Sequence, residues 1–137
     1  MSPTPPTVLV IAGSDPSGGA GLQANQRVLA MHGCYAVTAT TALTVQNTLG
    51  VQDVLVTPPE FLRRQLEALL EDVQVDVIKI GMLASKESNE VVRDVLEKWR
   101  ESEKEKGRSG CIVLDPVGLF PRAKRLMLME TVGHDFD

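Results

Sequence analysis

The sequence predicts an α/β fold, in which a mostly parallel sheet carries helices on both faces. Short apolar runs alternate along the chain with longer amphipathic segments, which is the pattern of strands connected by helices. The first apolar run, residues 8–12, leads into a loop with four glycines at positions 13–21, and a helical pattern follows. This order is typical of a small-molecule site, because glycine lets the backbone approach a ligand and a helix N-terminus presents free N–H groups.

Local signals predict where the elements begin and end. We expect strands over residues 8–12, 35–43 (followed by a turn), 51–56, 75–80 and 111–114. The first helix is expected over 20–32, with Gly33 just past its end. The second is expected to begin with Thr57 as its cap, Pro58 at the first helical position and Glu60 completing a capping box.

The third helix is expected to begin at Ser85 and to end in the charged run 100–106, which we expect to be solvated. Its inward face is predicted to comprise Val91, Val92, Val95, Leu96 and Trp99.

Composition excludes several classes of protein. The 137 residues are 43% hydrophobic and 23% charged, as in one globular domain. A net charge of −4 gives no general attraction to nucleic acid or to an anionic membrane, and no apolar run is long enough to span a bilayer. Residues 1–6 resemble a short disordered lead without a secretory signal. Cys34 and Cys111 show no metal-ligand spacing and predict two buried thiols in a reduced, cytoplasmic protein.

Polar or glycine residues follow several of the expected strands. In open parallel sheets, ligands bind beyond the carboxyl ends of the strands, so these residues are expected to lie close together. They are Ser14 and Asp15, Gln46 and Asn47, Gly81 and Met82, and Asp115.

Each of these groups has a structural alternative. The glycine loop matches neither a Walker A loop nor Gly-x-Gly-x-x-Gly, so it is either a tight strand-to-helix turn or a binding loop of another kind. The Gln46 amide matches the edge of an aminopyrimidine, whereas Asn47 could simply bond its own backbone in a turn. Asp115 could hold a metal ion or a phosphate-bound water, or cap a turn. Lys79, inside an apolar strand, is expected to pair with a carboxylate such as Asp115 or to reach the rim.

Taken together, these segments resemble the hydroxymethylpyrimidine/phosphomethylpyrimidine kinases, a ribokinase-like family of thiamine biosynthesis. The opening signature is AGSDPSGGAGLQA at 12–24, and the similarity continues through HGCY (32–35), TALTVQNT (41–48), KIGMLA (79–84) and VLDPV (113–117). The resemblance divides the chain into the lead 1–6, the N-terminal half of a kinase domain at 7–117, and a divergent tail at 118–137.

The resemblance implies a reaction. The family transfers the γ-phosphoryl group of ATP to 4-amino-5-hydroxymethyl-2-methylpyrimidine and then to its monophosphate. By motif match, Gln46 would bind the pyrimidine edge, Asn25 would face the substrate, and Gly13 and Met82 would line the pocket. Asp115 would lie near the ATP phosphates and Mg²⁺. The catalytic residue that activates the hydroxyl is expected in the part of the family sequence that follows.

Two departures from the family pattern carry consequences. The family usually has aspartate where this chain has Asn25, and if that position accepts substrate hydrogen bonds at both oxygens, binding is expected to weaken by about 1–3 kcal/mol. After Val117 the sequence differs from the family, so we expect this chain alone to be inactive and its open sheet to form a homo-oligomer or to be poorly soluble. Two alternatives remain: a non-catalytic pyrimidine-binding or interaction fragment, and a relative of the pyridoxal kinases.

Overall fold

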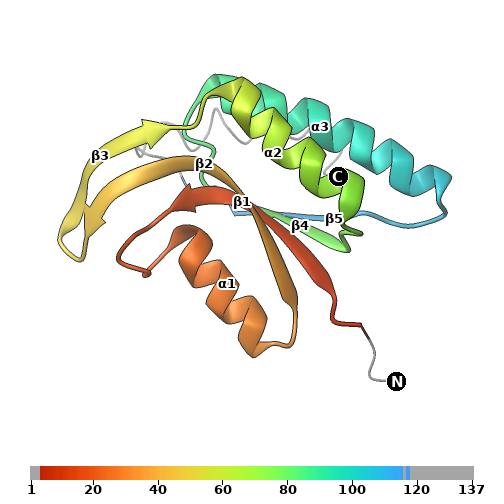
Figure 1. Cartoon of the computed structure of the whole chain (residues 1–137), viewed down its shortest axis with the longest axis horizontal. Helices are drawn as coiled ribbons and strands as arrows, with labels where there is room; N and C mark the ends of the chain where they lie inside the picture. The colour runs from red at the N-terminus through yellow and green to blue at the C-terminus, as the bar shows by residue number, and fades with distance from the viewer. Residues whose placement is uncertain (1–3, 116, 118–137) are drawn as a thin grey trace, which may run out of the picture.

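The computed structural model describes residues 4–115 and 117, in which one sheet has helices on both faces. α1 lies against one face, and α2 and α3 lie together against the other (Figure 1). The elements in chain order are β1 (Thr7–Ser14), α1 (Gly21–Met31), β2 (Tyr35–Asn47), β3 (Gly50–Val56), α2 (Pro59–Asp72), β4 (Val77–Ile80), α3 (Lys86–Glu105) and β5 (Cys111–Leu114). The predicted α/β class is confirmed.

The strand order of the sheet is β3-β2-β1-β4-β5. β1 pairs in parallel with β2 and with β4, β4 pairs in parallel with β5, and only the β2–β3 pair is antiparallel. The carboxyl ends of β1, β4 and β5 therefore point to the same edge of the sheet. The described residues that directly follow these strands, Asp15, Gly81 and Asp115, lie together at that edge.

β1 is the centre of the core. Every residue from Val8 to Gly13 is buried, with Leu9 and Ile11 packed toward the α2 and α3 layer and Val8, Val10 and Ala12 packed toward α1. A strand covered on both faces is apolar along its whole length, which explains the continuous run in the sequence. All five residues predicted for the inward face of α3 are buried.

β2 is longer than predicted. It runs from Tyr35 through Asn47 and continues as an antiparallel hairpin with β3, so that Gln46 and Asn47 end the strand rather than follow it. From Ala42 the strand pairs with β3, which supplies hydrogen-bond partners beyond Leu43, where the pairing with β1 ends. The Asn47 side chain accepts from the N–H of Leu49 at 2.9 Å, which is the turn role left open above.

The helix boundaries agree with the predictions to within one residue. α1 begins and ends one residue inside the predicted 20–32, Gly33 follows it with φ +71°, and the Ser85 hydroxyl caps α3 by accepting from the N–H of Ser88 at 3.0 Å. α2 begins at Pro59, one residue later than expected, and its cap is Pro58. The Thr57 hydroxyl donates to the carbonyl of Thr40 at 2.8 Å, which ties this residue to β2.

The predicted burial of both thiols is wrong. Cys34 is half-buried, and Cys111 is exposed at the start of β5. β5 is the last strand of the sheet within the part of the chain described, so one of its edges has no strand beside it there. Its residues consequently alternate between exposed and half-buried, although a buried strand was predicted.

Pro116 and the predicted divergent tail 118–137 lie outside the described residues, as do residues 1–3 of the predicted lead. Residues 4–6 are exposed and form neither helix nor strand. Within the described ranges, none of the helices combines the length and the apolar character needed to cross a membrane.

Candidate functional site

A cavity of ≈ 510 Å³ lies at the carboxyl ends of the strands, between the glycine loop, the first turns of α1 and the β2–β3 hairpin. It brings together residues that are far apart in the sequence. All five residues singled out for binding line it: Gly13, Asn25, Gln46, Met82 and Asp115.

Sequence reasoning missed other residues of this wall. Val28 lines the cavity beside Asn25, and Val51 lines it from β3. The spacing of Gly21, Asn25 and Val28 places them on one face of α1, so helical periodicity could have identified Val28. Val51 offered no such signal, because its position depends on the hairpin.

The glycine loop is folded around the carboxylate of Asp15, whose residue is only 4% exposed. Oδ1 accepts from the backbone N–H of Ser17 at 2.9 Å and from its hydroxyl at 2.7 Å, and Oδ2 accepts from the N–H of Ala20 at 2.9 Å. The Ser17 hydroxyl, aided by these backbone groups, lowers the pKa of Asp15 against the opposing effect of burial. Asp15 therefore holds the loop in shape, and its bonds are made within the protein.

Gln23 ties the start of α1 to the end of β1. Its Oε1 accepts from the N–H of Asp15 at 2.8 Å, and its Nε2 donates to the Ser14 hydroxyl at 2.7 Å. A glutamine in a helix gives no sequence signal for this role, since it depends on how α1 docks on β1.

Gly21 allows α1 to begin directly against β1. Its φ of +58° is in the left-handed region, and a Cβ there would lie 2.3 Å from the carbonyl oxygen of Gly13. That contact is with backbone, so no side-chain movement can relieve it. The close approach places the Asn25 face of α1 on the cavity.

Asn25 and Gln46 each leave one end of a side-chain amide unbonded in the cavity. Asn25 Nδ2 donates to the carbonyl of Gly21 at 2.6 Å, and this carbonyl partner identifies which end of the amide is nitrogen. One end of the Gln46 amide lies 3.1 Å from the Thr44 hydroxyl, whose single proton is donated to the Ser14 carbonyl at 2.8 Å. Within the described chain, Asn25 Oδ1 and the other end of the Gln46 amide have no protein partner. One acceptor and one amide end are thus available in one cavity.

The charged side of the cavity is formed by Lys79 and Asp115. Lys79 Nζ lies 3.2 Å from Asp115 Oδ2, which confirms the expected pairing with a carboxylate. The side chain of Lys79 is 21% exposed and that of Asp115 59% exposed. The pair joins β4 to the residue that follows β5.

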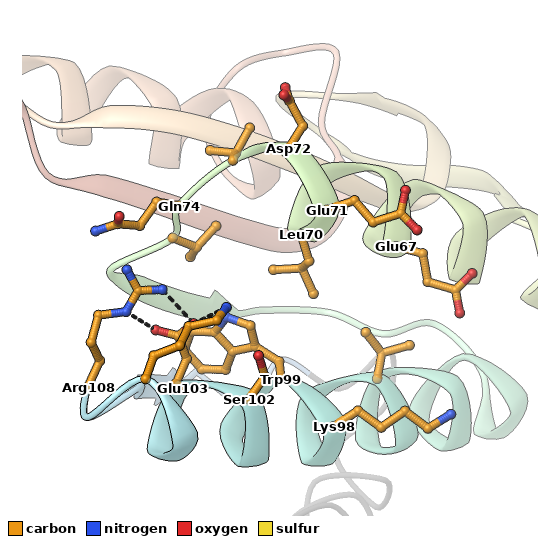
Figure 2. Close-up of a pocket in the computed structure, with 14 residues that line it drawn as sticks. Glu67, Leu70, Glu71, Asp72, Gln74, Lys98, Trp99, Ser102, Glu103 and Arg108 are labelled. Carbon is orange, nitrogen blue, oxygen red and sulfur yellow. Dashed lines mark hydrogen bonds and ion pairs between the residues drawn. The ribbon is translucent and has the colours of Figure 1, made fainter.

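A second cavity, of ≈ 380 Å³, lies between the end of α2 and α3 (Figure 2). It contains none of the predicted site residues. Its central feature is Glu103, which is 4% exposed although the run 100–106 was expected to be solvated. The carboxylate accepts from Arg108 Nε at 2.6 Å and Nη2 at 2.7 Å, as the dashed lines in Figure 2 show.

This ion pair fastens the C-terminal end of α3 to the segment that leads into β5. The N–H of Arg108 also donates to the Glu103 carbonyl at 2.8 Å, and Lys106 Nζ lies 3.3 Å from the carboxylate. Arg108 is the main cause of the lowered pKa of Glu103, against the opposing effect of burial. The charge of Glu103 is compensated by Arg108 and Lys106, so we assign this ion pair a structural role.

The comparisons with known proteins agree with this geometry. The fold is that of ribokinase-like α/β proteins. The sequence matches the profile of the phosphomethylpyrimidine kinase family over residues 15–134, and the chain belongs to this family.

Three relatives illustrate the similarity. Over 114 residues the chain is 47% identical to the hydroxymethylpyrimidine/phosphomethylpyrimidine kinase of Mycobacterium tuberculosis, covering 83% of this chain and 39% of that protein. The crystal structure of phosphomethylpyrimidine kinase from Clostridium difficile is 34% identical with a TM-score of 0.74, covering 87% of this chain and 48% of that one. A pyridoxal kinase from Staphylococcus aureus, in complex with AMP-PCP and pyridoxal, is 29% identical with a TM-score of 0.73, covering 92% of this chain and 44% of that one. The chain thus spans less than half the length of these relatives.

The contact at Gly21 can be tested with a matched pair of glycines. Gly33→Ala has the same left-handed backbone strain at φ +71° but open space around the new Cβ, so it is expected to cost about 1–2 kcal/mol. Gly21→Ala adds the clash with the Gly13 carbonyl and is expected to cost about 3 kcal/mol or more. Urea unfolding measures both, and equal losses would contradict the proposed close contact.

The buried Glu103 carboxylate predicts a pH-dependent stability. Its folded-state pKa is below 4.5, the ordinary value, so its contribution is complete above pH 4.5 and is lost as the pH falls through the folded pKa. Glu103→Gln is expected to lower the free energy of unfolding at neutral pH, and its difference from the native chain should narrow in acid. Urea unfolding over a pH series measures this, with Glu101→Gln, an exposed position on the same helix, as control. A difference that stays constant into acid would refute the assignment.

Proposed function

We propose that this chain forms the pyrimidine-binding part of a kinase that uses ATP to phosphorylate 4-amino-5-hydroxymethyl-2-methylpyrimidine and its monophosphate. The observation that carries the proposal is the free acceptor of Asn25 and the free end of the Gln46 amide in one cavity. An aminopyrimidine edge offers the complementary pair, a ring nitrogen that accepts and an amino group that donates. Membership of the phosphomethylpyrimidine kinase family supports the same substrate class.

Each wall of the cavity has a role in this proposal. Gln46 Nε2 would donate to the ring nitrogen, and Asn25 Oδ1 would accept from the exocyclic amino group. Met82 would pack against the ring, since its thioether adapts to flat apolar surfaces. Gly13 makes room for Met82, because a Cβ at Gly13 would lie 2.5 Å from Met82 Cε.

The hydrogen bond made by Asn25 indicates how much binding affinity is lost when asparagine replaces the family aspartate. The amide nitrogen of Asn25, which replaces one acceptor oxygen, is bonded to the Gly21 carbonyl rather than directed at a ligand. The remaining oxygen can still accept one hydrogen bond. The weakening relative to aspartate remains a prediction, and this geometry favours the lower end of the range of about 1–3 kcal/mol.

Asp115 is the candidate to hold Mg²⁺ at the nucleotide phosphates. The described residues contain no group of three or more His, Cys, Asp or Glu side chains that could form a metal site by themselves. A single carboxylate nevertheless fits Mg²⁺ in kinases, where phosphate oxygens and waters complete the coordination. Mg²⁺ would supply charge neutralisation at the phosphates, and the remaining work of phosphoryl transfer is positioning of the reactants.

The cavity holds no evident base for the hydroxyl of the substrate among its described residues. The carboxylate of Asp15 is bonded within the loop, and that of Asp115 is paired with Lys79. We therefore propose that this chain binds the pyrimidine but does not turn it over by itself. An assay for ADP release distinguishes this binder from a complete kinase.

Titration calorimetry with the hydroxymethylpyrimidine tests the proposal. Native chain is expected to bind it in preference to pyridoxal, which lacks the amino group. Gln46→Glu keeps the shape but removes the donor, so affinity is expected to fall about 10- to 100-fold. Gln52→Glu makes the same chemical change at an exposed β3 position outside the cavity and should have little effect.

Three outcomes would refute the substrate assignment. They are absence of heat with the native chain at millimolar ligand, equal affinity of Gln46→Glu and native chain, and tighter binding of pyridoxal than of the pyrimidine.

A further inference from the structure

Lys79 is the one basic residue among the described residues that line the site cavity. It lies within β4, where its register partners are Val10 on β1 and Val113 on β5. An ammonium group among apolar strand residues is costly to hold unless it is paired. Lys79 is therefore at a position where a function, rather than the packing of the sheet, favours a lysine.

The pairing with Asp115 leaves Lys79 with hydrogen-bonding capacity. An ammonium group has three N–H donors, and Asp115 Oδ2 at 3.2 Å is its single acceptor within the described chain. Because Lys79 lines the cavity, its remaining N–H donors can bind a ligand there. Because Asp115 is more than half exposed, the ion pair contributes little to stability.

Lys79 is the positive charge that offsets the negative charge of this cavity. Its other charged residues are Asp15 and Asp115, both negative. A phosphorylated ligand carries a further negative group, which would be repelled by two carboxylates with no cation nearby. Lys79 supplies the compensating charge, and charge-assisted hydrogen bonds to phosphate are among the strongest available to a side chain.

We propose that Lys79 binds the phosphate of the pyrimidine monophosphate and so lets this cavity accept the product of the first phosphorylation as the substrate of the second. The inference rests on the proposed function, because it takes the pyrimidine to be the ligand. It assigns the two ends of that ligand to different residues: the ring edge to Asn25 and Gln46, and the phosphate to Lys79.

The test compares two ligands, the pyrimidine alcohol and its monophosphate, by titration calorimetry in Mg²⁺-free buffer. Lys79→Met is expected to weaken binding of the monophosphate about tenfold or more and to leave binding of the alcohol nearly unchanged. Lys79→Arg keeps the charge and should retain most of the affinity. Lys98→Met is the matched control, since Lys98 forms an ion pair of the same 3.2 Å length outside this cavity.

A second variant leaves Lys79 in place. Asp115→Asn removes the carboxylate that competes for Lys79 and is expected to tighten binding of the monophosphate more than that of the alcohol. This test does not require Lys79→Met to fold. Raising the salt concentration should weaken monophosphate binding by the native chain more than by Lys79→Met.

The outcomes separate the two proposals. Equal monophosphate affinity for native and Lys79→Met chains, or equal losses for both ligands, overturns the role of Lys79 and leaves the pyrimidine site intact. An Asp115→Asn chain that binds the monophosphate no more tightly than the native chain does also overturns it. Failure of the native chain to bind either ligand overturns both proposals.

Discussion

The architecture of the site depends on the close approach of α1 to the end of β1. The carbonyl of Gly13 occupies the space that a side chain at Gly21 would need, and the carboxylate of Asp15 holds the intervening loop through Ser17 and Ala20. Because of this contact, the Asn25 face of α1 reaches the edge where the parallel strands end. A helix displaced from β1 would leave that edge open on one side.

Some polar side chains at the loop and the cavity stabilise the fold, and others have a hydrogen-bonding group left for a ligand. Asp15 and Gln23 make their hydrogen bonds within the protein and give the backbone its shape. Asn25 and Gln46 each use one end of an amide internally and leave the other end unpaired within the described chain. A half-used amide is oriented by its internal bond, so that little conformational entropy remains to be lost on binding.

Sequence patterns predicted the elements that are governed by local chemistry. The apolar run of β1, the inward face of α3, the Ser85 cap and the glycine after α1 all follow from short-range rules, and each agrees with the structure. Two predictions failed where side chains have partners that the local patterns did not indicate. α2 begins one residue late while Thr57 is bonded to β2, and Glu103 is buried in an ion pair with Arg108. Those partners become visible only once the chain is folded.

The amino-acid sequence by itself determined the α/β class, the set of polar residues at the strand ends and their convergence, because parallel strands bring their carboxyl ends to one edge. The tertiary structure decided which atoms of those residues remain available. It extended β2 into a hairpin that completes the wall of the cavity, and it directed one end of the Asn25 amide to Gly21 and Lys79 to Asp115. Spacing along a chain restricts which residues can meet, whereas the choice of each hydrogen-bond partner depends on the packing of elements that are distant in sequence.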